Sequence, residues 1–444
     1  MSAPAARLCE YCQGAFKPAP TDFPDFKVLL PTEAVNTIRE RLWCRLCTIV
    51  HAKFRPHQYT GMACVRFTLL DYPIGLKLRL ELKRHLVEEK CPLETDLALF
   101  ASESTGDLVW APSIPDTTES EGSRQFLSDQ LQNCFENHQK CRSITPASEK
   151  SGDQNPTRLL WVTGPESEKV YLRDGSSLQE TSQQRQLNGQ STIHYATLSH
   201  CWGDLVLPLL TQATVEALMR GISISDLPKT FRDAIQMTRT VGLEHLWIYS
   251  LCIFQDDPQD WGHEAQRMRA VYCNAVCNTA ASGTKNSAEG LYFAHAQAAD
   301  CAFWADVSWA PSTVKQTIQA KRYLVFTAPQ WKDSVEMALL NQRGWVMQER
   351  VLSKRVISFT QHQLFWECIE LRASETFPKG VPDITQSWWM YDKVGLKQRI
   401  FTDGRDSDEA SRDDKLALSE IHQSPRLSST TPQQHHILAA VHVS

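Results

Sequence analysis

Two pairs of cysteines near the start of the chain have a spacing that could hold a metal ion. Two residues separate Cys9 from Cys12, and two separate Cys44 from Cys47. Four thiolates satisfy tetrahedral zinc, so the first reading is a structural zinc site. The 31 residues between the pairs exceed the usual gap, and the stretch from Asp25 to Trp43 looks like an amphipathic helix with its lead-in. Cysteines that only pack between helices are the second reading.

A second group of candidate ligands consists of Cys134, His138 and Cys141. Cys91 or Cys64 could complete a set of four around one ion. The sequence holds 14 cysteines and no His-Glu-x-x-His motif, so any zinc is expected to be structural and not hydrolytic.

Two carboxylates are candidates for catalysis. Glu349 stands between Gln348 and Arg350, and it could act on a sugar-like bond or bind a ribose, with Arg350 or Arg343 holding an anionic group. The alternative is a helix-borne ion pair that only orients this segment. Glu264 could be a second site acid or the exposed polar edge of a helix.

Ser199, a possible nucleophile, is followed directly by His200, a possible general base. Neighbouring residues on a strand point to opposite faces, so the two side chains are not expected to pair. The chain also lacks the Gly-x-Ser-x-Gly turn of the serine hydrolases. We therefore do not expect serine-hydrolase chemistry here.

The elements that would position these residues alternate between strands and helices. Residues 195–200, 246–254 and 275–281 are expected as strands, and the segments between them carry apolar residues at helical spacing. This order predicts an α/β fold with a doubly wound, Rossmann-like parallel sheet and flanking helices. Residues 322–326 are a further expected strand, 343–352 a short helix, and 356–359 with 364–368 a hairpin.

Ligands of such sheets bind at the carboxyl ends of the strands. Polar, aromatic and small residues gather there, and the candidate ligand-binding residues are Ser199, His200, Trp202, Gly203, Gln255 and Asp256. Arg343, Trp345, Gln348 and Arg350 join them as candidates from the later helical segment.

Composition divides the chain into four parts. We expect a cysteine-rich, mainly helical region over residues 1–142, a polar linker or loop region over 143–194, the α/β domain over 195–368, and a C-terminal extension over 369–444. The stretch from Ser424 to Gln434 is expected to be disordered.

The charge and hydropathy of the chain exclude some partners. A formal net charge of −5 gives no basic field for nucleic acid. The N-terminus lacks a secretory pattern, and the longest apolar run is about half of the ~20 residues that a membrane helix needs. We expect a soluble, cytoplasmic protein without a membrane span.

Three segments in order resemble the motifs of the fungal heterokaryon-incompatibility (HET) family. The first reads Tyr-Ala-Thr-Leu-Ser-His-Cys-Trp-Gly from Tyr195 to Gly203. The second runs from Leu246 to Ala275, and the third covers residues 343–353 and 364–368. Flanking pieces at residues 134–141 and 414–418 also resemble the family. The resemblance spans roughly residues 130–420.

This resemblance implies a protein of self/non-self recognition and programmed cell death in fungi, acting with protein partners and through self-association. The family's domain is thought to be similar to the TIR fold, some members of which cleave the glycosidic bond of NAD with a glutamate. NAD glycohydrolase activity is therefore implied by analogy of fold alone.

The second motif departs from the family pattern at two positions. Tyr249 and Phe254 stand where the family usually has acidic or amide residues. A tyrosine can hydrogen-bond but carries no charge near pH 7. The alternative reading is therefore a non-enzymatic or degenerate regulatory protein that retains the fold.

Overall fold

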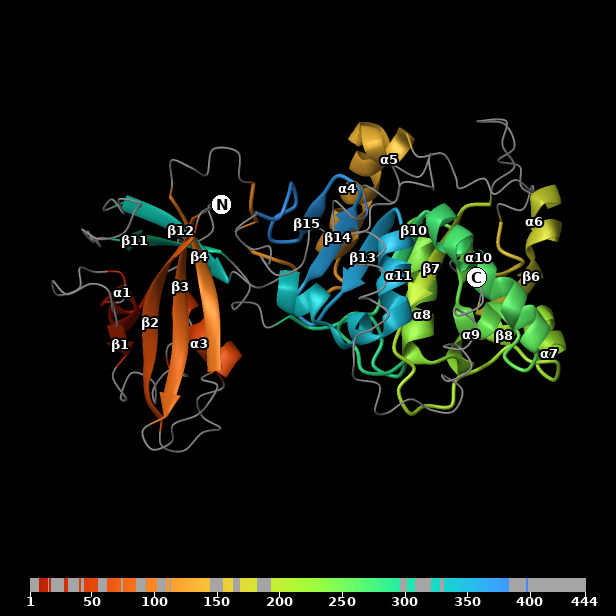
Figure 1. Ribbon diagram of the computed structural model, residues 1–444, viewed down its shortest axis with the longest axis horizontal. Helices are drawn as coiled ribbons and strands as arrows, with labels where there is room; N and C mark the ends of the chain where they lie inside the picture. The colour runs from red at the N-terminus through yellow and green to blue at the C-terminus, as the bar shows by residue number, and fades with distance from the viewer. Residues whose placement is uncertain are drawn as a thin grey trace, which may run out of the picture.

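The computed structural model describes residues 8–14, 16, 28–30, 40, 44–54, 62–72, 75–84, 93–101, 109–111, 113–143, 155–162, 168–181, 193–295, 302–307, 321–327, 331–382 and 397. These residues form two β-sheets, which Figure 1 shows beside each other, with most of the helices around the larger one. The segment from Ser424 to Gln434 and the residue Cys91 lie outside the described residues.

The smaller sheet has six antiparallel strands in the order β1-β2-β3-β4-β12-β11. The strands are β1 (Val28–Leu30), β2 (Met62–Tyr72), β3 (Gly75–Arg84), β4 (Leu93–Ala101), β11 (Phe303–Val307) and β12 (Lys321–Thr327). Its helical neighbours are α1 (Glu10–Gly14) and α3 (Arg45–Phe54).

The prediction of a mainly helical N-terminal region is not confirmed, because four strands lie within it beside the helices. The reason is visible in β3, where leucines alternate with charged residues from Leu76 to Leu82. Such a period of two buries one face of a strand and cannot form an apolar helical stripe. Val28–Leu30, in the lead-in of the helix expected between Asp25 and Trp43, is a strand, and most of the rest of that stretch lies outside the described residues.

The larger sheet has nine strands in the order β15-β14-β13-β10-β7-β9-β5-β6-β8. Its strands are β5 (Arg158–Val162), β6 (Lys169–Asp174), β7 (Tyr195–Ser199), β8 (Ile222–Ser223), β9 (His245–Trp247), β10 (Cys277–Ala280), β13 (Arg355–Phe359), β14 (Leu364–Cys368) and β15 (Arg372–Ser374). The four central strands β13, β10, β7 and β9 are parallel, and the outer ones are antiparallel. The α/β core is confirmed, but the sheet is mixed and not parallel throughout, because short turns such as that between β13 and β14 can only join antiparallel strands.

Helices cover both faces of the larger sheet. They are α4 (Glu121–Asn137), α5 (Gln139–Ser143), α6 (Gly175–Thr181), α7 (Val215–Arg220), α8 (Lys229–Thr240), α9 (Tyr249–Cys252), α10 (Pro258–Asn274) and α11 (Gly344–Leu352). Short 3-10 helices at Ile224–Asp226 and Leu339–Gln342 and a π-helical turn at Lys332–Glu336 complete the set. The side chain of Asp257 caps α10 by accepting from the N–H groups of Gln259 and Asp260.

The order of the parallel strands fixes which face each helix covers. The crossover from β7 to β9 moves one way along the sheet, whereas those from β9 to β10 and from β10 to β13 move the other way. Since such crossovers are right-handed, α8 lies on one face and α10 with α11 on the other. Alternation along β7 then points Tyr195, Thr197 and Ser199 towards α10 and α11, and His200 towards α8.

One expected strand is only partly a strand. The apolar run of residues 246–254 forms β9 and then turns directly into α9, where Ser250, Leu251 and Cys252 are buried. A short apolar run is buried equally well as a strand or as a helical turn, so periodicity does not separate the two. The strand expected near residues 322–326 is confirmed as β12, although it belongs to the smaller sheet.

The interval of residues 143–194, expected as linker or loop, contributes β5 and β6 to the larger sheet. The hairpin of β13 and β14 and the helix α11 agree with the expected elements. Among the described residues, no helix combines the length and the apolar character needed to cross a membrane.

Candidate functional site

A polar cluster lies at the carboxyl ends of the central strands β7 and β10, centred on Glu349 of α11. The Ser199 hydroxyl, at the end of β7, donates to a carboxylate oxygen of Glu349. The Tyr272 hydroxyl of α10 hydrogen-bonds to the same carboxylate. Asn278 of β10 donates from its side-chain amide to the Ser199 oxygen over 3.0 Å. Three elements far apart in sequence therefore meet at one carboxylate, on the α10–α11 face of the sheet.

The surroundings of Glu349 suppress its ionisation. Burial raises the pKa of the Glu349 carboxyl above its ordinary value, although Ser199, Arg343 and Tyr272 each favour the charged form. Glu349 as a whole residue is partly buried, and its hydrogen-bonded carboxyl group is the part removed from solvent. A carboxyl group with a raised pKa at the end of a parallel strand holds its proton more readily than an exposed one, which suits general acid–base chemistry.

Aromatic side chains stand beside this carboxyl group. Tyr249 opens α9 directly after β9, and its hydroxyl accepts from the Trp261 indole N–H over 2.6 Å. The Trp202 ring lies with its centroid 6.1 Å from that of Tyr249. Burial raises the pKa of Tyr249, and the negative charge of Glu349 adds to this rise. Tyr249 thus occupies the family's acidic position within reach of the charge of Glu349.

His200 does not join the cluster. Its ring packs edge-on against Phe231 of α8, with centroids 4.9 Å apart, on the opposite face of the sheet from Glu349. Burial, together with the positive charge of Arg343, lowers the pKa of His200 to about 3, so this side chain is neutral. Its backbone oxygen accepts from Arg343 Nη1 over 2.7 Å, which holds Arg343 at the entrance to α11.

Gly203 has a structural reason to be glycine. Its φ is +65°, and a Cβ atom there would lie 2.4 Å from the Cβ of Asn286. The turn after β7 therefore passes so close to the loop after β10 that no side chain fits. Backbone packing explains this motif position without a ligand.

Gln255 and Asp256 serve the loop after β9. The Gln255 side-chain amide donates to the Ile253 carbonyl over 2.8 Å, and Asp256 accepts from the Gln212 N–H over 3.0 Å. These contacts fasten residues 209–212 to the end of α9. The expected convergence of the three motif loops on one site thus includes Ser199 and Glu349, whereas the Asp256 side chain is engaged elsewhere.

The residues around Glu349 on α11 have separate roles. Arg350 forms a buried ion pair with Glu367 of β14, with Nε and Oε2 2.7 Å apart. Gln348 is partly buried on the same helix, and the Trp345 side chain lies outside the described part of the structure. Arg350 therefore forms an ion pair that can orient this segment, but its partner is Glu367 and not the neighbouring Glu349.

Glu264 belongs to a different cluster. It is buried on α10, where it accepts from the Thr157 hydroxyl and lies 4.0 Å from Arg158. Arg158 also binds Asp260 with two contacts of 2.5 and 2.6 Å and stacks over the Phe254 ring. Phe254, the second departure from the family pattern, therefore packs in this cluster and not with Glu349.

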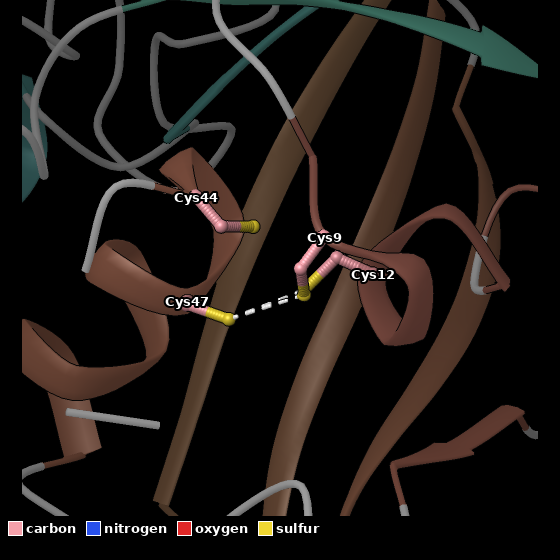
Figure 2. A group of neighbouring side chains, drawn as sticks. All are labelled: Cys9, Cys12, Cys44 and Cys47. Atoms are coloured by element: carbon pink, nitrogen blue, oxygen red, sulfur yellow. Dashed lines mark hydrogen bonds between the residues drawn. The ribbon is translucent and has the colours of Figure 1, made fainter. Parts of the chain in front are cut away.

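The four cysteines at the N-terminal end come together as their spacing suggested. Figure 2 shows Cys9 and Cys12 from the α1 segment facing Cys44 and Cys47 from the α3 segment. All four are buried, and their sulfurs lie within 4.8 Å of one another. The Cys47 sulfur is 3.6 Å from that of Cys9 and 3.5 Å from that of Cys12. Sulfurs around tetrahedral zinc lie about 3.8 Å apart for Zn–S bonds of about 2.3 Å, so this cluster could hold a metal ion.

Some functional residues carried too weak a signal in the sequence. Asn278 is a polar residue inside a buried strand, which was the available hint. Tyr272 is one of the residues at helical spacing between the second and third expected strands, and it lies within the second motif, but neither pattern indicates a contact with Glu349. Neither could be assigned to Glu349 without the pairing of β7 with β10, which places Ser199 opposite Ala280.

Comparison with known proteins adds one match. Residues 195–349 match the model of the family described as Heterokaryon incompatibility protein (HET). No curated protein and no solved structure matches the chain. The matched residues run from the first residue of β7 to Glu349, so they include both ends of the polar cluster. With the three motifs in order and this match, the chain carries a heterokaryon-incompatibility (HET) domain over residues 195–349.

Proposed function

We propose that this chain is a cytoplasmic effector of self/non-self recognition and programmed cell death in fungi, and that the Glu349 cluster is its working site. The observation that carries the proposal is the desolvated Glu349 carboxyl, with its pKa raised by burial and with Ser199, Tyr272 and Arg343 around it. A carboxyl group that only stabilises a fold is commonly paired with a cation, as Glu367 is with Arg350. Protein partners and self-association would bring such a domain into action.

The chemistry that suits this site is cleavage of a nucleotide's glycosidic bond, with NAD as the candidate substrate. The C–N bond to nicotinamide breaks, the base leaves with the electron pair, and water adds to the ribose carbon. Glu349 would bind the ribose or assist the attack, and Arg343 would hold a phosphate. Trp202 and Tyr249 offer aromatic faces to a planar ring.

Expression in a fungal host tests this proposal. The full chain is expected to arrest growth, and Glu349→Gln, which keeps size and hydrogen bonds but removes the titratable proton, is expected to abolish the arrest. Glu216→Gln on α7 is the matched control, because Glu216 is exposed and bonds only to Arg220 along its helix. Purified protein incubated with NAD should release nicotinamide, with a loss of about 10²-fold or more in Glu349→Gln.

The position of Tyr249 favours one second candidate, a non-enzymatic regulatory protein with the same fold. Tyr249 places a neutral hydroxyl beside Glu349 where the family usually has a carboxylate or amide. If the full chain leaves growth unimpaired and NAD intact at high expression, the effector proposal fails. Tyr249→Asp would then distinguish the two readings, because toxicity gained by this variant marks a degenerate enzyme.

We also propose that Cys9, Cys12, Cys44 and Cys47 bind structural zinc. The buried sulfurs at 3.5–3.6 Å are too far apart for disulfides of about 2.05 Å and close to the spacing around zinc. Cys9→Ser with Cys12→Ser is expected to remove about one zinc per chain, measured by elemental analysis of purified protein. An unchanged zinc content would contradict this assignment.

A further inference from the structure

A second set of four metal-ligand side chains lies beside β14, near one edge of the larger sheet. Cys134 of α4, His138 between α4 and α5, Cys141 of α5 and Cys368 at the end of β14 place their ligand atoms within 4.8 Å of one another. The three cysteines are buried and His138 is partly buried. Cys368 follows Cys141 by more than two hundred residues, so only the fold brings them together.

The fourth ligand differs from the two expected from the sequence. Cys91 lies outside the described residues, and β2, which contains Cys64, belongs to the six-stranded sheet. Cys368 instead reaches the cluster because α4 packs against β14. The Cys368 sulfur lies 3.2 Å from His138 Nδ1, close to the ~3.5 Å expected between a nitrogen and a sulfur on one tetrahedral zinc.

Hydrogen-bond donors surround the sulfurs. Arg355 Nε donates to the Cys134 sulfur over 3.1 Å, and the Leu371 N–H donates to the Cys368 sulfur over 3.3 Å. The backbone N–H groups of Ile369 and Glu370 donate to the Cys141 sulfur. Neutral thiols need no such set of donors, whereas metal-bound thiolates are stabilised by them.

The histidine ring is held by its second nitrogen. His138 Nε2 lies 3.2 Å from the side-chain amide of Asn133, one turn earlier on α4. This contact orients the ring so that Nδ1 faces the three sulfurs. A metal on Nδ1 leaves the ring proton on Nε2, so in the metal-bound form the Asn133 amide would present its oxygen to this nitrogen.

We propose that Cys134, His138, Cys141 and Cys368 form a second zinc site, which fastens α4 and α5 to the turn between β14 and β15. Three sulfurs and one nitrogen match the Cys₃His set of closed, structural zinc sites, in which no position is left for a substrate. Three thiolates and one Zn²⁺ leave a net charge of −1, and the guanidinium of Arg355 lies beside the Cys134 sulfur.

The proposed zinc site would also affect the opposite face of the sheet. Cys368 and Glu367 are neighbours on β14 and point to opposite faces. The metal would hold the strand from the α4 side, while Glu367 holds α11 through Arg350 on the other side. The position of β14, and with it the position of α11, would therefore depend on the bound ion.

Elemental analysis of the full chain, purified without chelator, tests the proposal independently of any activity. About two zinc ions per chain are expected, since each set of four ligands holds one. Cys134→Ser with Cys368→Ser should remove one, Cys9→Ser with Cys12→Ser should remove the other, and the four changes together should remove both. Cys273→Ser, a buried cysteine of α10 outside both clusters, is the matched control and should leave the zinc content unchanged.

A variant that should still bind the metal separates loss of a ligand from loss of folding. His138→Cys retains four ligands and should keep two ions, and Co²⁺ loaded in place of zinc should show an absorption change from a Cys₃His to a Cys₄ site. Zinc content that is the same in the wild type and in the Cys134→Ser, Cys368→Ser variant would overturn the proposal, as would a Co²⁺ spectrum that His138→Cys leaves unaltered. If only the cluster of Cys9, Cys12, Cys44 and Cys47 fails to bind zinc, one zinc per chain should remain, and Cys134→Ser with Cys368→Ser should remove it.

Discussion

Replacing Glu367 with leucine is expected to lower the free energy of unfolding by about 3–5 kcal/mol, because it leaves buried cations without a counter-charge. Glu367 is buried on β14 and faces Arg350 at 2.7 Å, Arg372 at 3.4 Å and Lys397 at 3.7 Å. Burial alone would raise the pKa of Glu367, but the charges of Arg350, Lys397 and Arg372 hold it below its ordinary range. This carboxylate is therefore charged at neutral pH.

Urea denaturation at pH 7 measures this loss. Glu216→Gln is the control, since the exposed pair of Glu216 with Arg220 should contribute about 0–1 kcal/mol. Arg350→Met combined with Glu367→Leu should recover part of the loss, because it removes a charge from each side of the pair. A Glu367→Leu protein as stable as the wild type would show that water reaches these cations.

The second large effect concerns pH and comes from Glu375. Burial raises the pKa of this carboxyl from 4.5 to about 7, although the Ser123 hydroxyl and the Leu364 N–H favour its charged form. An acid whose pKa rises on folding stabilises the fold most while it is protonated. Its contribution is full below about pH 4.5, declines as the pH rises, and is lost above about pH 7. The decline amounts to about 3 kcal/mol.

Glu375→Gln isolates this contribution. The variant keeps an oxygen for the Leu364 N–H, and its amide can donate to Ser123, whose hydroxyl already donates to the Thr117 carbonyl. Between pH 5 and pH 8 the wild type should lose about 2–3 kcal/mol relative to the variant. His200, whose lowered pKa acts in the opposite direction, contributes equally to both proteins. Parallel stability curves for the two proteins would refute the assignment, and Glu136→Gln on the exposed side of α4 is the control.

The sequence predicted the central α/β elements because their patterns are local. The apolar face of α10 and the run that becomes β10 each depend on neighbouring residues. The Cys9, Cys12, Cys44 and Cys47 cluster was also accessible, since a two-residue spacing marks each half. Patterns among neighbouring residues were therefore sufficient to predict the central elements and the first cysteine cluster.

The remaining features depend on which distant segments become neighbours. Nothing near Glu349 indicates that Asn278 supports it through Ser199, since that link follows from the register of β7 against β10. Likewise, Cys368 reads as the last residue of an apolar strand until α4 is placed against it. The spacing of residues along the chain does not determine which strands pair. The sequence therefore indicated several residues of the candidate site but not the contacts between them.

The placement of β11 and β12 has a consequence for the design of chimeric chains. Both strands lie between the second and third motifs, within residues 195–349, yet β12 pairs with β4 of the preceding region. A chimera that exchanges only residues 195–349 would therefore bring two of the six strands of the smaller sheet from a different chain. Substitutions at the contact of β4 with β12 would then meet unmatched neighbours, so segments 93–101 and 303–327 are best exchanged together.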